Sequence, residues 1–246
     1  DKVIEYRRLL QSISAEDRTL LMERMDEFTK KYPQYADLMP VRESIYRLNE
    51  LEAIQMQIRL QQLEIGAIEQ EEFRRHFEEQ ARRAANIAAE ELGFGKDFYR
   101  YDSEVVRATV GAAWAAGGDF SANIWANREK LASYLNDDFS KLIARGVSYD
   151  EISRELRQRL NHSGAKTAMR LVYTEGTYLF NEAQARVHES EFDSYALSCI
   201  HDGRACEVCR ELEAYQKQHP AKFSERMPGT NFPPMHPWCR CSYTLE

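Results

Sequence analysis

The residues best suited to chemistry are the cysteines and one histidine near the C-terminus. All five cysteines of the 246-residue chain lie within residues 199–246. Cys206 and Cys209 form one short knuckle, and His236, Cys239 and Cys241 form a second after an intervening loop. Thiolates and imidazole nitrogens are the preferred ligands of structural Zn²⁺, which takes four of them in a tetrahedron. The spacing therefore predicts a structural zinc site that uses four of these five residues.

The choice among the five donors stays partly open. Cys206 and Cys209 are the first pair, and two of His236, Cys239 and Cys241 complete the site. His236 and Cys239 are favoured because their spacing mirrors the first knuckle, with Cys241 as the substitute. The fifth cysteine of the chain, Cys199, lies in a β-prone run over residues 194–200. We expect it to be a buried thiol and not a ligand.

Other uses of these cysteines fit the sequence less well. An odd number of cysteines and an N-terminus without a secretory signal disfavour disulfides. A redox Cys-x-x-Cys needs alternating strands and helices, which this helical sequence lacks. The motifs of zinc deaminases and His-Glu-x-x-His proteases are absent. A zinc hydrolase with Glu175 or Glu207 as general base is the least favoured hypothesis, because soft ligands would fill every metal position.

Charge and composition bound the remaining possibilities. The formal net charge is -7, with 43% hydrophobic and 30% charged residues, which is typical of a globular protein without a polyanion-attracting field. Contact with double-stranded DNA is an alternative hypothesis that requires local basic clusters. The candidates are Arg154, Arg157 and Arg159, or Arg82 and Arg83. The sequence predicts no membrane span, and the missing initiator Met leads us to expect that an upstream segment has been removed.

Helical periodicity dominates the first three quarters of the chain. Apolar residues recur at helical spacing over residues 41–92, as one helix or as two joined near Gly66. Further helices are expected at the N-terminus up to about Lys31, after Asp102 and over residues 121–145. A capping box at Ser148–Glu151 should begin a helix that stops before Gly164, and a last helix is expected over residues 165–192.

The fold class that follows is mainly α, with an elongated helical body and a small α+β zinc-stapled C-terminal module. We expect two domains: a helical N-terminal body at residues 1–146, and a second domain at residues 147–246 that contains the zinc module at about residues 199–246. The long amphipathic helix predicts a docking surface for a partner.

A polar line runs along the last predicted helix. Arg170, Thr174, Asn181 and His188 are four, seven and seven residues apart, so they lie near one helical face. Because large aromatic residues flank them, we expect a partly buried hydrogen-bond network that fixes the helix to its neighbours.

These motifs resemble those of a known family. The string from Asp202 to Cys209 (DGRACEVC) and the string from Pro233 to Cys241 (PPMHPWCRC) resemble the closing signature of the phage head morphogenesis family, the Mu F-like minor capsid proteins. The preceding helix is similar to that family's Arg-x-x-x-Thr-Glu pattern with a downstream Asn. The resemblance extends the structural network to Arg170, Thr174, Glu175, Asn181, Asp202 and Arg204. One departure is that Leu212-Glu213-Ala214 stands where the family commonly has Leu-Asp-Gly, so the Gly that favours a turn there is absent.

The resemblance implies a function as well as a fold. It implies a non-enzymatic virion protein inside the capsid, made in the host cytoplasm and associated with the portal. Its expected roles are head assembly and genome packaging or ejection, and the structural Zn²⁺ predicted from the spacing is the expected cofactor. The implied partners are the portal protein, the major capsid or scaffolding protein, and packaged double-stranded DNA.

Overall fold

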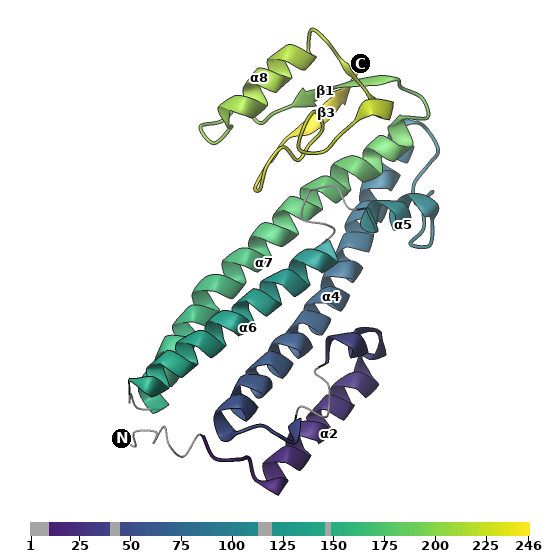
Figure 1. The fold of residues 1–246 in the computed structure, drawn as a ribbon. Helices are drawn as coiled ribbons and strands as arrows, with labels where there is room; N and C mark the ends of the chain where they lie inside the picture. The colour runs from purple at the N-terminus through teal and green to yellow at the C-terminus, as the bar shows by residue number, and fades with distance from the viewer. Residues whose placement is uncertain (1–9, 40–44, 113–119, 146–148) are drawn as a thin grey trace. The chain divides into compact units, whose positions relative to one another are not determined.

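The computed structural model describes residues 10–39, 45–112, 120–145 and 149–246 (Figure 1). It confirms the predicted fold class, because helices make up most of the described chain and a small sheet with one short helix closes its C-terminal end. The chain forms two compact units. Unit 1 comprises residues 1–70 and 124–167, and unit 2 comprises residues 71–123 and 168–246. The domain boundary predicted at residues 146 and 147 stays a prediction.

Unit 1 begins with helix α2 (Ala15–Lys31), as predicted, followed by the 3-10 helix η1 (Pro33–Leu38). The Ser14 hydroxyl caps α2 by accepting the backbone N–H of Asp17 at 3.0 Å. A buried apolar cluster joins α2 to the first part of helix α4 (Glu50–Glu91). This core comprises Leu21, Met25, Phe28, Tyr32, Ile45, Leu60, Leu63 and Ala67.

Helix α4 is one continuous helix, but it starts later than predicted. The prediction of a start near residue 41 is wrong, because a reciprocal cap begins the helix at residue 50. The Asn49 side chain accepts from the Glu52 N–H, and the Glu52 carboxylate accepts from the Asn49 N–H, both at 2.9 Å. Gly66 does not divide the helix. It leaves room for the ring of Trp125 on helix α6 (Phe120–Ala144), which lies 2.6 Å from where a Cβ at residue 66 would be.

Helix α7 (Tyr149–His188) also differs from the prediction. The expected stop before Gly164 is wrong, because the helix runs through this residue without a break. A single interior Gly costs a helix only about 1 kcal/mol, so it is a weak terminator within a long helix. The predicted capping residue, Ser148, lies outside the described residues. The predicted end near residue 192 is late, since α7 ends at His188.

Unit 2 contains the C-terminal parts of α4 and α7, helix α5 (Glu104–Val110) and the terminal module. In this module strand β1 (Ser194–Ser198) pairs antiparallel with β2 (Ala221–Lys222) on one side and with β3 (Ser242–Leu245) on the other. Helix α8 (Glu207–Gln216) connects β1 to β2. The 3-10 helix η2 (Phe223–Glu225) follows directly after β2. Tyr195, Phe223 and Phe232 form the aromatic core beside the sheet.

Candidate metal centre

The first knuckle lies at the start of helix α8. Cys206 is the N-cap residue, and its backbone is extended (φ −76°, ψ 155°), as a cap requires. Its Sγ accepts the backbone N–H of Cys209 at 3.3 Å, which turns both thiols toward the same side. The positive end of the helix dipole favours thiolates here, and the thiolate is the form that binds metal.

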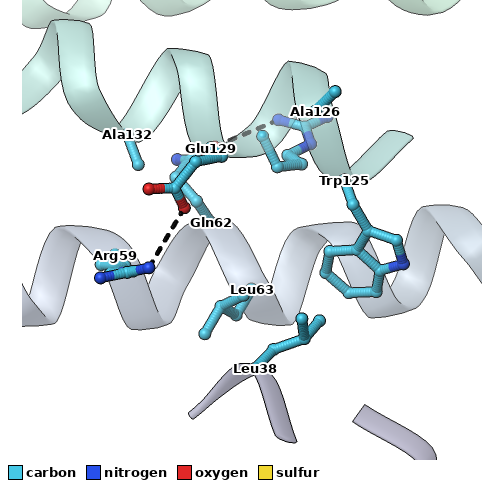
Figure 2. Close-up of a pocket in the computed structure, with 9 residues that line it drawn as sticks. Leu38, Arg59, Gln62, Leu63, Trp125, Ala126, Glu129 and Ala132 are labelled. Carbon is cyan, nitrogen blue, oxygen red and sulfur yellow. Dashed lines mark hydrogen bonds and ion pairs between the residues drawn. The ribbon is translucent and has the colours of Figure 1, made fainter. Parts of the chain in front are cut away.

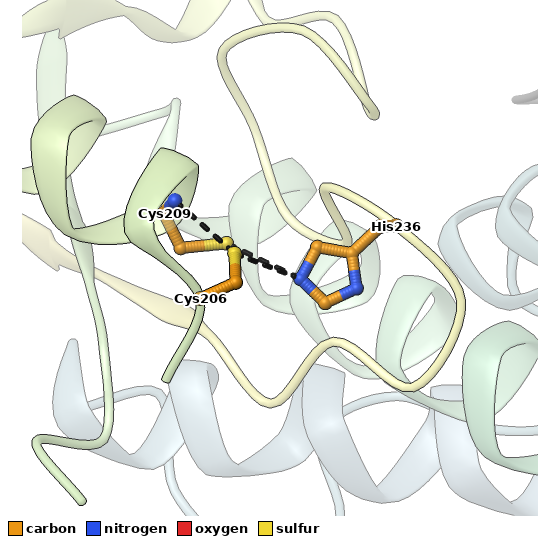
Figure 3. Close-up of side chains that lie close together, drawn as sticks. All are labelled: Cys206, Cys209 and His236. Carbon is orange, nitrogen blue, oxygen red and sulfur yellow. Dashed lines mark hydrogen bonds between the residues drawn. The ribbon is translucent and has the colours of Figure 1, made fainter. Parts of the chain in front are cut away.

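The second knuckle brings an imidazole to these thiols. The Nδ1 of His236 donates to the carbonyl oxygen of Pro237 at 2.8 Å, so the tautomer leaves Nε2 free to accept. Nε2 lies 3.2 Å from the Sγ of Cys206 and 3.5 Å from the Sγ of Cys209 (Figure 3). A tetrahedral zinc ion holds a sulfur and a nitrogen about 3.6 Å apart, so the three atoms are spaced as ligands of one ion.

A second group of donors overlaps the first. The sulfurs of Cys209, Cys239 and Cys241 lie within 4.8 Å of one another, as do the donor atoms of the Cys206, Cys209 and His236 group. Cys209 belongs to both groups, and all five cysteines are free thiols. The structure thus brings the five predicted donors together from two segments of the chain. Which four bind an ion stays a prediction.

The thiol environment favours thiolates at two of these positions. A hydrogen bond from Cys241, assisted by backbone hydrogen bonds, lowers the pKa of Cys239 to about 5. Burial opposes ionisation of Cys206, but hydrogen bonds from the side chain and backbone of Cys209 and from His236 outweigh it and lower its pKa. Burial raises the pKa of Cys209, in contrast, so this thiol needs a cation beside it to ionise.

Side chains of α7 hold the second knuckle from the other side. The Thr174 hydroxyl accepts the backbone N–H of Trp238 at 3.2 Å, and the Asn181 amide donates to the carbonyl of Cys241 at 3.2 Å. Thr177, which the sequence analysis did not select, donates to the carbonyl of Cys239 at 3.3 Å. Its position on the same face, between Thr174 and Asn181, is the signal that could have identified it.

The rest of the predicted polar line divides into buried and exposed residues. His188 is buried, with Nδ1 at 2.9 Å from the Tyr243 hydroxyl and Nε2 at 3.1 Å from the Glu91 carboxylate. Burial lowers the pKa of His188. Glu175 is buried on α7, whereas Arg170 is exposed and outside the buried line.

Asp202 and Arg204 organise the loop before α8. The Asp202 carboxylate accepts from the Arg240 guanidinium at 2.6 and 2.8 Å, and it also accepts the backbone N–H of Arg204 at 2.9 Å. The Arg240 hydrogen bonds hold the pKa of Asp202 well below its usual range. This pair connects the loop to the second knuckle, while the Arg204 side chain is exposed.

Two buried carboxylates in unit 2 were not predicted. Glu182 on α7 pairs with Arg226 through two hydrogen bonds of 2.9 Å, and their side chains are only 6% and 13% exposed. Glu213 accepts the backbone N–H of Cys199 at 3.3 Å and pairs with Lys217 at 3.1 Å. Glu213 lies within α8, so the helix continues where the family's Leu-Asp-Gly predicted a possible turn. Neither carboxylate has a local sequence signal that reveals its partner.

The residues of the alternative hypotheses are less well placed. Arg154 and Arg157 are exposed on α7, and the Arg159 side chain lies outside the described residues. Arg82 is engaged with Glu79 and Asp97, and Arg83 is exposed. Glu207, proposed as a general base, is the exposed first residue of α8. Within the described part of the chain, no helix is both long enough and apolar enough to cross a membrane.

Unit 1 contains a separate pocket of about 280 Å³ (Figure 2). Leu38, Leu63 and Trp125 give it an apolar wall, and an ion pair between Arg59 and Glu129, at 3.5 Å, also lines it. The pocket has no cysteine or histidine in its lining, so it offers packing space and not metal chemistry.

Comparison with known proteins finds a similarity for the C-terminal part of the chain. Residues 134–244 match the model of the family described as Phage Mu protein F like protein, so this part of the chain is similar to that family. The matched range includes all five donors and the hydrogen-bonding residues of α7. Searches of curated proteins and of solved structures gave no match. The predicted resemblance is confirmed, and it supports a phage head-related protein from a structural and morphogenesis family.

Proposed function

We propose that this chain is a non-enzymatic minor head protein of a phage virion that binds the portal and acts in head assembly and in genome packaging or ejection. The observation that carries the proposal is the convergence of the two Cys/His knuckles, the second of which is hydrogen-bonded to α7, within the segment that matches the Mu F-like family. A module of this kind provides a folded end of a helical body, which is a structural role.

The donor set fits structural zinc. Cys206, Cys209 and His236 supply soft ligands at distances suited to one ion, and the sulfurs of Cys239 and Cys241, within 4.8 Å of that of Cys209, are the candidates for the fourth position. Zinc, when bound, would act as a crosslink between segments that have few apolar residues to hold them together. The chain's own residues orient the donors: Pro237 fixes the His236 tautomer, and α7 fixes the backbone of the second knuckle.

The partner surface is proposed on helix α4. Two of its isoleucines in unit 1 remain exposed, Ile65 at 39% and Ile68 at 50%, although they follow the same helical periodicity as the buried core. Exposed aliphatic residues three apart on a helix form a docking stripe that a portal subunit could cover.

Copurification tests the portal assignment. The full chain is coexpressed with its phage's portal, major capsid and scaffolding proteins, and the complex is captured through the portal. We expect the wild-type chain to copurify, Ile65→Asp with Ile68→Asp to reduce recovery at least about tenfold, and the control Arg74→Asp, exposed on another face of the same helix, to have no effect. Failure of the wild-type chain to bind portal would refute the assignment. X-ray absorption at the zinc edge tests the metal role, and an ion with three protein ligands and a water would favour the hydrolase instead.

A further inference from the structure

An exposed pair of aromatic rings lies beside the metal centre. Tyr173 on α7 and Trp238 in the second knuckle contact each other, with ring centroids 5.3 Å apart and an interplanar angle of 40°. Trp238 is 46% exposed and Tyr173 is 38% exposed. Large aromatic side chains carry much of the apolar surface that folding and binding bury. This pair is therefore apolar surface that the described part of the chain leaves open to solvent.

The backbone holds Trp238 in a strained conformation. Its φ is 64°, in the left-handed region that a bulky side chain rarely adopts. Two hydrogen bonds keep it there: the Trp238 N–H donates to the Thr174 hydroxyl at 3.2 Å, and the Cys239 N–H donates to the His236 carbonyl at 3.0 Å. Glycine adopts this conformation without strain, so the turn alone does not explain a tryptophan at this position. Strain that the surroundings enforce is concentrated at ligand-binding and switch sites.

Apolar and basic side chains surround the two rings. Met169 and Arg170 lie four and three residues before Tyr173, which places them one turn away on the same side of α7, and both are exposed. Trp238 also lines a small recess beside the metal centre, together with other residues of both knuckle segments. We call the surface formed by these residues of unit 2 the Trp238 patch, which comprises Met169, Arg170, Tyr173, Ile200, Arg204, Trp238 and Arg240.

The charge of the Trp238 patch is opposite to that of the whole chain. Arg170 and Arg204 are exposed, and Arg240 is paired with the Asp202 carboxylate. Three arginines against one aspartate leave an excess of positive charge, whereas the chain has a formal net charge of -7. Trp, Tyr, Met and Arg are the residue types enriched in protein interfaces, and Trp, Tyr and Arg dominate their binding energy. The patch therefore matches a partner that is acidic and partly apolar.

From this surface we infer that the Trp238 patch binds an acidic segment of another head protein of the same phage. An apolar side chain of that segment covers the Tyr173 and Trp238 rings, and its carboxylates pair with Arg170 and Arg204. Nucleic acid fits the patch less well, because Asp202 already neutralises Arg240 and the negative chain repels a polyanion. The inference rests on the proposed head function, but it concerns unit 2, whereas the exposed isoleucines of α4 belong to unit 1.

Peptide binding to the intact chain tests the inference. Short overlapping peptides that cover the phage's portal, major capsid and scaffolding proteins are screened against the full zinc-loaded chain. Binding is then followed by NMR through the indole N–H signals of the three tryptophans, of which Trp238→Phe removes one and so identifies it. We expect an acidic peptide to shift the Trp238 signal, with an affinity that falls as salt concentration rises.

Matched variants separate this surface from general effects. Arg170→Glu with Arg204→Glu, and separately Tyr173→Ala, should each weaken peptide binding at least about tenfold. The controls are Arg157→Glu, an exposed arginine on the same helix, and Tyr215→Ala, an exposed aromatic residue on α8, and both should bind the peptide as the wild type does. Equal zinc content in all variants shows that the module is intact.

Several results would overturn the inference. These are the absence of any acidic peptide that binds, binding that leaves the Trp238 signal unmoved, and unchanged affinity in zinc-loaded Tyr173→Ala. A single-stranded oligonucleotide that shifts the Trp238 signal at lower concentration than any peptide would assign the patch to nucleic acid instead. A chain that copurifies with portal but binds no peptide would refute this inference alone. A chain that binds an acidic peptide but fails to copurify would refute only the portal assignment.

Discussion

Replacing Gly66 with alanine should destabilise unit 1, although alanine favours helices. A Cβ at residue 66 would lie 2.6 Å from Cζ3 and 3.1 Å from Cε3 of the Trp125 ring. Non-bonded carbon atoms pack at about 3.5–4.0 Å, so the ring would have to move by roughly 1 Å. The ring also packs edge-on against Tyr35, with centroids 4.8 Å apart, and this contact resists the movement.

The expected magnitude comes from two opposing effects. Overpacking a filled contact costs about 1–3 kcal/mol, and replacing an interior helical Gly by Ala gains about 1 kcal/mol. The net loss for Gly66→Ala is therefore about 1 kcal/mol. Gly176 on α7 is the matched control, because a Cβ there would meet no heavy atom within 4 Å. Gly176→Ala should stabilise the protein by about 1 kcal/mol, which places the two variants about 2 kcal/mol apart.

Urea unfolding at fixed zinc concentration measures the difference. Tryptophan fluorescence and far-UV circular dichroism should be followed together, because coincident curves are needed before a free energy of unfolding is assigned. If both alanine variants are stabilised by the same amount, the Trp125 ring does not occupy the space beside Gly66, and the packing described for unit 1 is wrong.

Three further predictions concern unit 2. Glu182→Ala should lower the free energy of unfolding by about 3 kcal/mol, because it leaves the buried Arg226 guanidinium without the carboxylate that accepts two of its hydrogen bonds. A double-mutant cycle with Arg226→Met should show a coupling energy of at least about 1 kcal/mol between the two residues. Additive losses in stability would contradict this prediction. Burial holds the pKa of His188 below its ordinary value of 6.5, so the unfolded chain binds this proton first as the pH falls. The stability that His188 contributes should therefore be full above about pH 6.5 and be lost below it, and His188→Asn should show a shallower loss than the wild type in urea titrations across that range. Removing metal with a chelator should increase hydrogen exchange in α8 and in residues 236–241 while leaving α2 unchanged, and equal exchange with and without the chelator would argue against a metal that holds the module together.

Helical periodicity predicted most of the helices, but not where they end. The apolar spacing of α4 and α6 reflects the burial of one face of each helix. This pattern can be identified in the sequence without knowing which elements the helix packs against. The wrong stop at Gly164 came from treating Gly as a terminator, although its cost is small compared with the packing of a long helix. The cap at Asn49 was missed because residues 41–49 continue the apolar pattern without a Pro or Gly.

The donors were predictable because zinc ligation imposes short local spacings. Cys206 with Cys209, and His236 with Cys239, can be identified from the sequence alone. The position of Cys199 could not, since it depends on the register between β1 and β3, which are more than forty residues apart in the sequence. The pairing of Glu182 with Arg226 was also not predictable, because a buried charge pair leaves no periodic pattern in the sequence of either segment.

The hydrogen bonds between α7 and the second knuckle should affect how the protein responds to force. Thr174, Thr177 and Asn181 hold the backbone of residues 238–241 by hydrogen bonds spread over two turns of the helix. A pull on the C-terminal strand would load these bonds together, in shear along the helix, instead of opening them one after another. Single-molecule stretching from the C-terminus should therefore show a resistance that drops when Asn181 is changed to alanine, even with the metal still bound.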